Sequence, residues 1–178
     1  HDDSIYIYKI SEQGEYSLHW SITYVHSSAI VGMDWSLDSK FLRAVDQAYA
    51  KIFYNVEESQ QVPDGSSTLV DPAIWATSTC KLGWEVMGVY PQGADGTDIN
   101  TVDASADRKL VAAGDDFGSV RVFRYPVLKT SHQCKRMTGH SEHVPRVRFY
   151  NSGDEQYLIS GGGNDRTYIQ WKAVPNKD

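Results

Sequence analysis

A short strand motif recurs along this chain, and the recurrence limits the folds available more than any other feature. Each copy is a run of apolar, aromatic and polar residues that follows a turn containing Asp or Gly. The copies are SIYIYKI (4–10), AKIFYNV (50–56), SVRVFRY (119–125) and TYIQWKA (167–173). Equivalent residues lie 46, 69 and 48 positions apart, so the middle interval carries an insertion of about 22 residues. Repeats of this length are typical of solenoids, propellers and other repeat arrays.

Further strands are expected in register with these motifs. The strands directly ahead are FLRAV, KLVAAG and YLISGG, and ahead of those lie IVGMDWS, DINTVDAS and VPRVRFY. A strand should open each unit, at about 16–24, 74–81 and 133–137. The sequence therefore predicts an all-β chain with a leading strand at 4–10 and units at 11–56, 57–125 and 126–173. Inserted loops are expected at 57–71 and 90–97, where Gly, Pro and polar residues are frequent.

The last unit contains residues that resemble the WD repeat of β-propellers. A Gly-His pair ending at His140 precedes the strand VPRVRFY, and Asp165 lies six residues before Trp171. The resemblance implies a buried network, because a buried carboxylate needs hydrogen-bond donors and His and Trp N–H groups can supply them. Gly161 stands where the family usually has Ser or Thr, with Ser160 one position away. We therefore expect a network of His140, Asp165, Trp171 and Ser160 that is incomplete.

The first unit departs further from this pattern. His26 occupies the matching place, but Val25 precedes it instead of Gly, and the third strand carries Phe53-Tyr54 instead of Trp. The first unit is therefore expected to be degenerate.

Longer stretches make the resemblance more specific. They are IYIY (5–8), HSSAIVGMDWS (26–36), WATSTCKLGWEVMGVYPQGADGTDIN (75–100), GDDFGSVRVFRYP (114–126), GHSEHVPRVRF (139–149) and LISGGGND with QW (158–171). In this order they resemble the C-terminal WD repeats of the echinoderm microtubule-associated protein-like family. The resemblance implies a WD-repeat β-propeller with about three full blades plus a partial one, an incomplete ring, since seven blades need about 300 residues. It also implies tubulin or microtubules as partners, a cytoplasmic, cytoskeletal location, and no catalysis.

Several residue groups suggest other functions, but each lacks an essential part. Asp95, Asp98 and Asp103 could offer oxygen ligands to calcium, although their spacing is not that of an EF-hand and no terminal Glu follows. His140 with Asp165 and Ser160 has the composition of a hydrolase triad, without an exposed nucleophile or oxyanion donors. The DDFG sequence at 115–118 is expected to form a turn in which Gly118 adopts a positive φ. We therefore predict no catalytic residue, no metal ligand and no cofactor.

Charge suggests where a protein partner would bind. The chain carries 17 basic and 23 acidic residues, a net charge of −6, which argues against nucleic acid or a membrane surface as partner. Between Arg124 and Arg148, however, six basic residues face a single acidic one. Because microtubules are acidic, the candidate partner-binding patch is Lys135, Arg136, Arg146 and Arg148. The alternative is that these charges scatter over different faces, and that the chain is a WD-repeat scaffold recruiting another protein, with tubulin binding elsewhere.

Three further expectations follow from composition and length. Cys80 and Cys134 lack zinc-site spacing and are expected to be reduced thiols, although a single disulfide stays open as an alternative. No apolar run reaches the roughly 18–20 residues that a membrane helix needs. About half a propeller would leave unpaired strand edges, which could support self-association.

Overall fold

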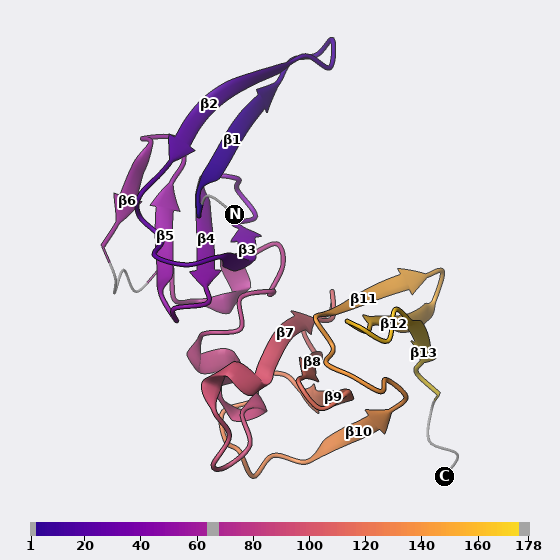
Figure 1. Ribbon diagram of the computed structural model, residues 1–178. Coiled ribbons are helices and arrows are strands. Elements are labelled where there is room, and N and C mark those ends of the chain that lie inside the picture. The colour runs from indigo at the N-terminus through magenta and orange to yellow at the C-terminus, as the bar shows by residue number, and fades with distance from the viewer. Residues whose placement is uncertain (1–2, 64–67, 175–178) are drawn as a thin grey trace. The chain divides into compact units, whose positions relative to one another are not determined.

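The structure is a computed structural model that describes residues 3–63 and 68–174 (Figure 1). The chain divides after Ala76 into two compact units. In the described residues the strands form four antiparallel sheets, which contain two, four, four and three strands. The all-β class expected from the sequence is therefore confirmed.

The first unit contains two sheets. One consists of β1 (Ile5–Ile10) and β2 (Tyr16–Ile22), and the other of β3 (Ile30–Trp35), β4 (Phe41–Asp46), β5 (Lys51–Asn55) and β6 (Gln60–Val62). A 3₁₀ helix, η1 (Pro72–Ile74), follows the second sheet. Alternate residues of β1 face inward, so Ile5 and Ile7 pack with Ile22 against Leu42 and Tyr54 of the four-stranded sheet. This period-2 burial is the reason that the sequence of β1 alternates.

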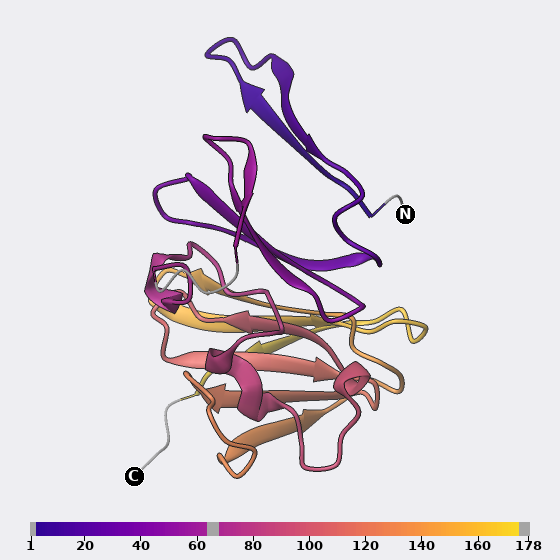
Figure 2. The same ribbon diagram turned by 90° about the vertical axis from the view of Figure 1, so that its left-hand side faces the viewer.

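The second unit also contains two sheets. Its elements are η2 (Trp84–Val89), η3 (Gly96–Asp98), β7 (Ile99–Ala104), β8 (Leu110–Asp115), β9 (Ser119–Arg124), β10 (Cys134–Thr138), β11 (Arg146–Ser152), β12 (Glu155–Gly161) and β13 (Tyr168–Lys172). Strands β7 to β10 form one sheet and β11 to β13 the other, with β11 in contact with β7 and β8. Figure 2 shows the strands of this unit, coloured pink to yellow, lying roughly alongside one another.

Strands β7 to β9 are largely buried on both faces of their sheet. On one face, Val86 and Val89 of η2 pack against Val102 and Phe123. On the other face, Ala112 and Val120 pack against residues of the β11–β13 sheet. Two-sided burial explains why β8 reads as a nearly continuous apolar run instead of an alternating one.

The sheets group the strands differently from the sequence units. The strand expected to open the first unit, β2, pairs with the leading strand β1, and β10 likewise pairs with β9, which precedes it. The units 11–56, 57–125 and 126–173 therefore each take strands from two sheets. The physical reason is local, because each last strand folds back antiparallel on the strand just before it in the sequence.

The inserted region also differs from the expectation. A short strand, β6, lies within 57–71 and pairs with β5, while residues 64–67 of that loop lie outside the described residues. No strand forms over 74–81, where Pro72 enters η1 and Trp75 makes only an isolated bridge to Ser36. The segment 90–97 is mostly irregular, and η3 begins at its end. The polar sequence of β6 carried no alternating signal from which a strand could be predicted.

A buried ion pair stacked on a tryptophan anchors this inserted region to the first unit. Arg43 Nε donates to Asp34 Oδ2 at 2.9 Å, and both side chains are almost fully buried. The Arg43 guanidinium carbon lies 4.7 Å from the ring centroid of Trp75, which also packs on Phe53. Trp75 Nε1 donates to the Leu69 carbonyl at 3.2 Å. A charge pair buried in this way is stable only while its surroundings stay packed.

Replacing Trp75 should therefore destabilise the first unit strongly. Trp75→Ala removes a side chain that is 1% exposed and uncovers the Arg43–Asp34 pair, so we expect a loss of about 3–5 kcal/mol in unfolding free energy. Trp35→Ala, at a site 39% exposed in the same unit, should cost clearly less. Urea unfolding of both variants measures the difference, and equal losses would contradict the role given to Trp75.

Candidate functional site

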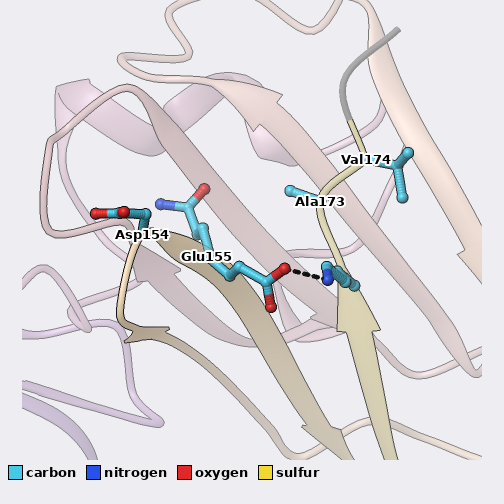
Figure 3. A pocket seen from close by; sticks show the side chains of 6 residues that line it. Asp154, Glu155, Ala173 and Val174 are labelled. Carbon is cyan, nitrogen blue, oxygen red and sulfur yellow. Dashed lines mark hydrogen bonds and ion pairs between the residues drawn. The ribbon is translucent and has the colours of Figure 1, made fainter. Parts of the chain in front are cut away.

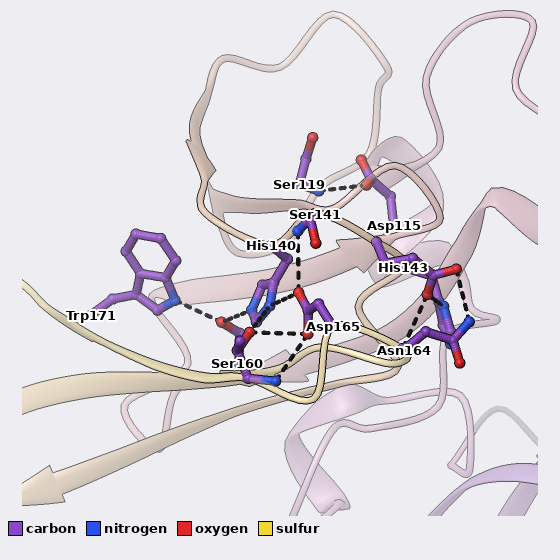
Figure 4. Close-up of polar contacts among 11 residues, drawn as sticks. Asp115, Ser119, His140, Ser141, His143, Ser160, Asn164, Asp165 and Trp171 are labelled. Atoms are coloured by element: carbon purple, nitrogen blue, oxygen red, sulfur yellow. Dashed lines mark hydrogen bonds and ion pairs between the residues drawn. The ribbon is translucent and has the colours of Figure 1, made fainter.

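His140, Ser160, Asp165 and Trp171 lie in hydrogen-bond contact in the last sheet (Figure 4). Trp171 Nε1 donates to Ser160 Oγ at 2.8 Å, and Ser160 Oγ lies 2.8 Å from His140 Nε2. His140 Nδ1 lies 3.0 Å from Asp165 Oδ2. The distances fit one chain of donors, in which Trp171 donates to Ser160, Ser160 to His140 and His140 to Asp165. The expectation of an incomplete network is wrong, because Ser160 itself bridges Trp171 and His140.

The Asp165 carboxylate gathers further donors from the turn around it. The Thr167 N–H and hydroxyl each donate to Oδ1 at 3.0 Å, and the Ser141 N–H donates to Oδ2 at 3.1 Å. Burial of Asp165 acts to raise its pKa, but the hydrogen bonds from Thr167, His140 and Ser141 outweigh it. The pKa of Asp165 is therefore held below its ordinary value of 3.8.

The loop after His140 is fastened to the turn that carries Asp165. Glu142 accepts hydrogen bonds from the backbone N–H and the side-chain amide of Asn164, at 3.2 and 3.1 Å, and also contacts His143 Nδ1. The Asn164 N–H is the main cause that lowers the pKa of Glu142. A Cβ atom at Gly139 would lie 2.8 Å from Ile169 Cδ1, so the Ile169 side chain would have to shift to accommodate a larger residue there. Side-chain contacts beyond those of His140 itself therefore hold the loop and the turn together.

The first unit contains a related network that the sequence analysis treated as degenerate. His26 Nδ1 lies 3.1 Å from Asp46 Oδ2, and the Tyr54 hydroxyl lies 2.9 Å from His26 Nε2. Burial and the charge of Asp46 raise the pKa of Tyr54, which keeps its proton available for donation to His26. Tyr54 thus supplies directly the donor that Trp171 and Ser160 supply together in the last sheet. Its position on the third strand, where Trp was expected, was the available signal.

The middle sheet uses an arginine in the corresponding place. Asp115 Oδ1 accepts hydrogen bonds from the N–H groups of Phe117 and Ser119, at 3.0 and 2.8 Å, the latter visible in Figure 4. Asp115 Oδ2 lies 3.6 Å from Arg121 Nη2. Gly118 adopts a φ of +76° in this turn, as expected from DDFG. The sequence has no histidine between His26 and His132, so another residue type had to pair with Asp115, and this was the available signal for Arg121.

The four basic residues of the expected patch lie on two different strands. Lys135 and Arg136 are exposed neighbours on β10, so they point to opposite faces of their sheet. Arg146 and Arg148 are exposed on one face of β11, in the other sheet. Arg148 Nη1 lies 3.8 Å from Asp103 Oδ1, which partly neutralises its charge. The strands thus divide the patch into a β10 pair and a β11 pair.

Other groups singled out in the sequence are placed as follows. In the described part of the chain, no three His, Cys, Asp or Glu side chains are grouped to hold a metal ion. Ser160 is fully buried, so the triad-like set of His140, Asp165 and Ser160 offers no accessible nucleophile. Cys80 is buried and Cys134 exposed, and they form no disulfide. Among the described residues, no helix has the length and apolar character needed to cross a membrane.

A hollow lies beside the start of β12 and the end of β13 (Figure 3). It measures about 760 Å³ and is lined by Asp154, Glu155, Gln156, Lys172, Ala173 and Val174. Lys172 donates to Glu155, as the dashed line in Figure 3 marks. Because Lys172 and Glu155 neutralise each other, the remaining charge on this lining is the Asp154 carboxylate.

Removing the imidazole of His140 should destabilise the second unit. His140→Ala leaves Ser160 and Asp165 without their shared partner in a buried site, so we expect a loss of about 1–3 kcal/mol in unfolding free energy. His132→Ala, at an exposed histidine of the same unit, should change little. Chemical denaturation measures both, and a shift near zero for His140→Ala would count against the network.

The lowered pKa of Asp165 makes the network sensitive to acid. A carboxylate with a depressed pKa stabilises the folded state above about pH 4, and this contribution is lost as pH falls through the folded-state pKa. The Asp165→Asn variant should therefore be less stable than the parent protein at pH 7. Between about pH 5 and 3 its stability should fall less than that of the parent, because it has no carboxylate at this position to protonate. Thermal unfolding midpoints of the two proteins across this range test the difference, and parallel curves would contradict it.

Comparison with known proteins identifies the architecture. The sequence profile described as "Echinoderm microtubule-associated protein second beta-propeller" matches residues 1–173. The chain is 40% identical over 174 residues to the 77 kDa echinoderm microtubule-associated protein of Strongylocentrotus purpuratus, covering 98% of this chain and 25% of that protein. It is 41% identical over 172 residues to the ciliary WD repeat-containing protein ctxp80 of Euplotoides octocarinatus, covering 97% and 23%. It is 39% identical over 175 residues to human echinoderm microtubule-associated protein-like 4, covering 98% and 17%.

These matches confirm the propeller class and the resemblance found in the sequence. The chain spans about a quarter or less of the length of these relatives. Propellers of this family are non-enzymatic parts of microtubule-associated proteins. Antiparallel sheets in which a histidine holds the turn aspartate, as in the β3–β6 and β11–β13 sheets, fit the WD-repeat class, and the chain belongs to the echinoderm microtubule-associated protein family, as part of its second β-propeller.

Proposed function

We propose that this part of the propeller contributes to microtubule binding by presenting a surface that contacts tubulin. Its relatives include proteins named as microtubule-associated, and the same association is proposed for this chain, with a cytoplasmic, cytoskeletal location. The blades act as a rigid frame that holds exposed strands and loops in place for a partner. No chemical step is involved, so the function depends on the surface alone.

The observation that supports this proposal most directly is the charge on β10. Lys135 and Arg136 are exposed on the last strand of their sheet, and in the described part of the chain no carboxylate forms an ion pair with either. The chain as a whole is acidic, so a local excess of unneutralised positive charge favours an acidic partner. Arg146 and Arg148 on β11 contribute less to the attraction of an acidic partner, because the Asp103 carboxylate lies close to Arg148 and offsets part of its charge.

Charge reversal, one strand at a time, tests this proposal. In the intact protein, Lys135→Glu with Arg136→Glu should weaken microtubule co-sedimentation about tenfold at low salt, and Arg146→Glu with Arg148→Glu should weaken it less. Lys109→Glu is the control, since Lys109 is highly exposed and lies on neither strand. Unchanged binding of both double variants would overturn the proposal and favour a scaffold that recruits another protein.

A further inference from the structure

A small pocket on the β7–β10 sheet combines two arginines with an exposed aromatic ring. It measures about 280 Å³ and is lined by Pro91, Asp98, Asp115, Phe117, Arg121 and Arg136. A pocket of this size is smaller than a site for a drug-sized ligand, which usually measures about 300–1,000 Å³. It can accept one side chain of a partner. All of its residues belong to the second unit.

The two arginines are placed where their charges repel. Arg121 on β9 and Arg136 on β10 are directly paired across the strands and therefore share one face of the sheet. Like charges at such positions destabilise a sheet, and Asp115, 3.6 Å from Arg121, offsets the charge of only one of the two arginines. The arrangement thus indicates a site for a negatively charged group.

The hydrogen bonds of these arginines are also incomplete. Arg121 Nε is buried and has no acceptor, and its Nη2 lies at the long distance of 3.6 Å from Asp115 Oδ2. Arg136 donates from Nε and Nη2 to a single oxygen, Ser119 Oγ, at 2.9 and 2.7 Å. A guanidinium group with too few acceptors is costly, so an acceptor that reaches the outer N–H groups of Arg121 or Arg136 would be bound favourably. Guanidinium groups in fork geometry fit a carboxylate, which can accept two hydrogen bonds at once.

The other lining residues favour a peptide over a free anion. Asp98 would repel a doubly charged phosphate or sulfate more strongly than a singly charged carboxylate, and it could accept a hydrogen bond from a peptide N–H beside a bound carboxylate. Phe117 is 73% exposed at the pocket and offers an apolar surface to a neighbouring side chain. We propose that this pocket binds a glutamate or aspartate side chain of an extended acidic peptide from a partner protein.

Binding of a defined peptide to the intact protein tests this proposal. The probe is a fluorescein-labelled peptide of Glu-Phe-Gly repeats, followed by anisotropy, with the Gln-Phe-Gly peptide as its neutral counterpart. Arg136→Lys and Arg121→Lys keep the charge but lose the planar fork, so each should raise Kd about tenfold. Lys109→Gln removes an exposed charge far from the lining and should leave Kd within about twofold.

Three other results would each overturn the proposal. Wild-type affinity in Arg136→Lys, which changes an exposed residue and so should fold, would exclude the pocket even if Arg121→Lys fails to fold. If Lys109→Gln weakened peptide binding as much as the arginine variants do, the peptide would be attracted by the overall charge of the protein and not by this pocket. Displacement of the peptide by inorganic phosphate at equal concentration would show a simple anion site. The arginine-to-lysine variants keep the positive charges on which microtubule co-sedimentation is proposed to depend, and the peptide probe contains no tubulin. Failure of the peptide-binding proposal is therefore distinguishable from failure of the proposed function.

Discussion

A buried aspartate near the turn between the second and third strands is the constraint on which each larger sheet depends. Asp46, Asp115 and Asp165 all lie at this turn, and each accepts backbone N–H groups that the turn leaves without partners. The second carboxylate oxygen then needs a donor or a positive charge, which comes from His26, Arg121 or His140. The aspartate is the common element, and the residue that satisfies it varies.

Variation of the partner explains why the last network was predicted best. His140, Asp165 and Trp171 follow the repeat spacing, so three of its members could be found from the order of residues alone. The role of Ser160 depends on the position of its hydroxyl between Trp171 and His140. Because Ser160 lies one residue away from the place where the repeat pattern has Ser or Thr, the sequence alone does not reveal this position. In the other sheets Tyr54 and Arg121 replace the expected residue types, so a pattern based on residue identity misses them.

Strand prediction succeeded where a strand is buried and apolar and failed where a strand is short and polar. The strands at β4, β8 and β12 are apolar and could be placed from sequence, whereas β6 is a short polar strand defined only by pairing with β5. The segment near Trp75 is apolar because it covers Arg43 and Phe53, not because it forms a strand. The basic residues were found by counting, but counting could not show that Lys135 and Arg136 point to opposite faces.

The pairing of β2 with β1 and of β10 with β9 determines where such a chain can be cut or joined. A break between β9 and β10, which would seem natural from the sequence repeat, removes the last strand of one sheet. It leaves the backbone groups on one edge of β9 without partners, because only β8 still pairs with it. A break between β2 and β3, or between β10 and β11, leaves every sheet whole. Duplication, deletion or fusion of blades in this architecture is therefore tolerated best at those loops, one strand away from the apparent end of the repeat.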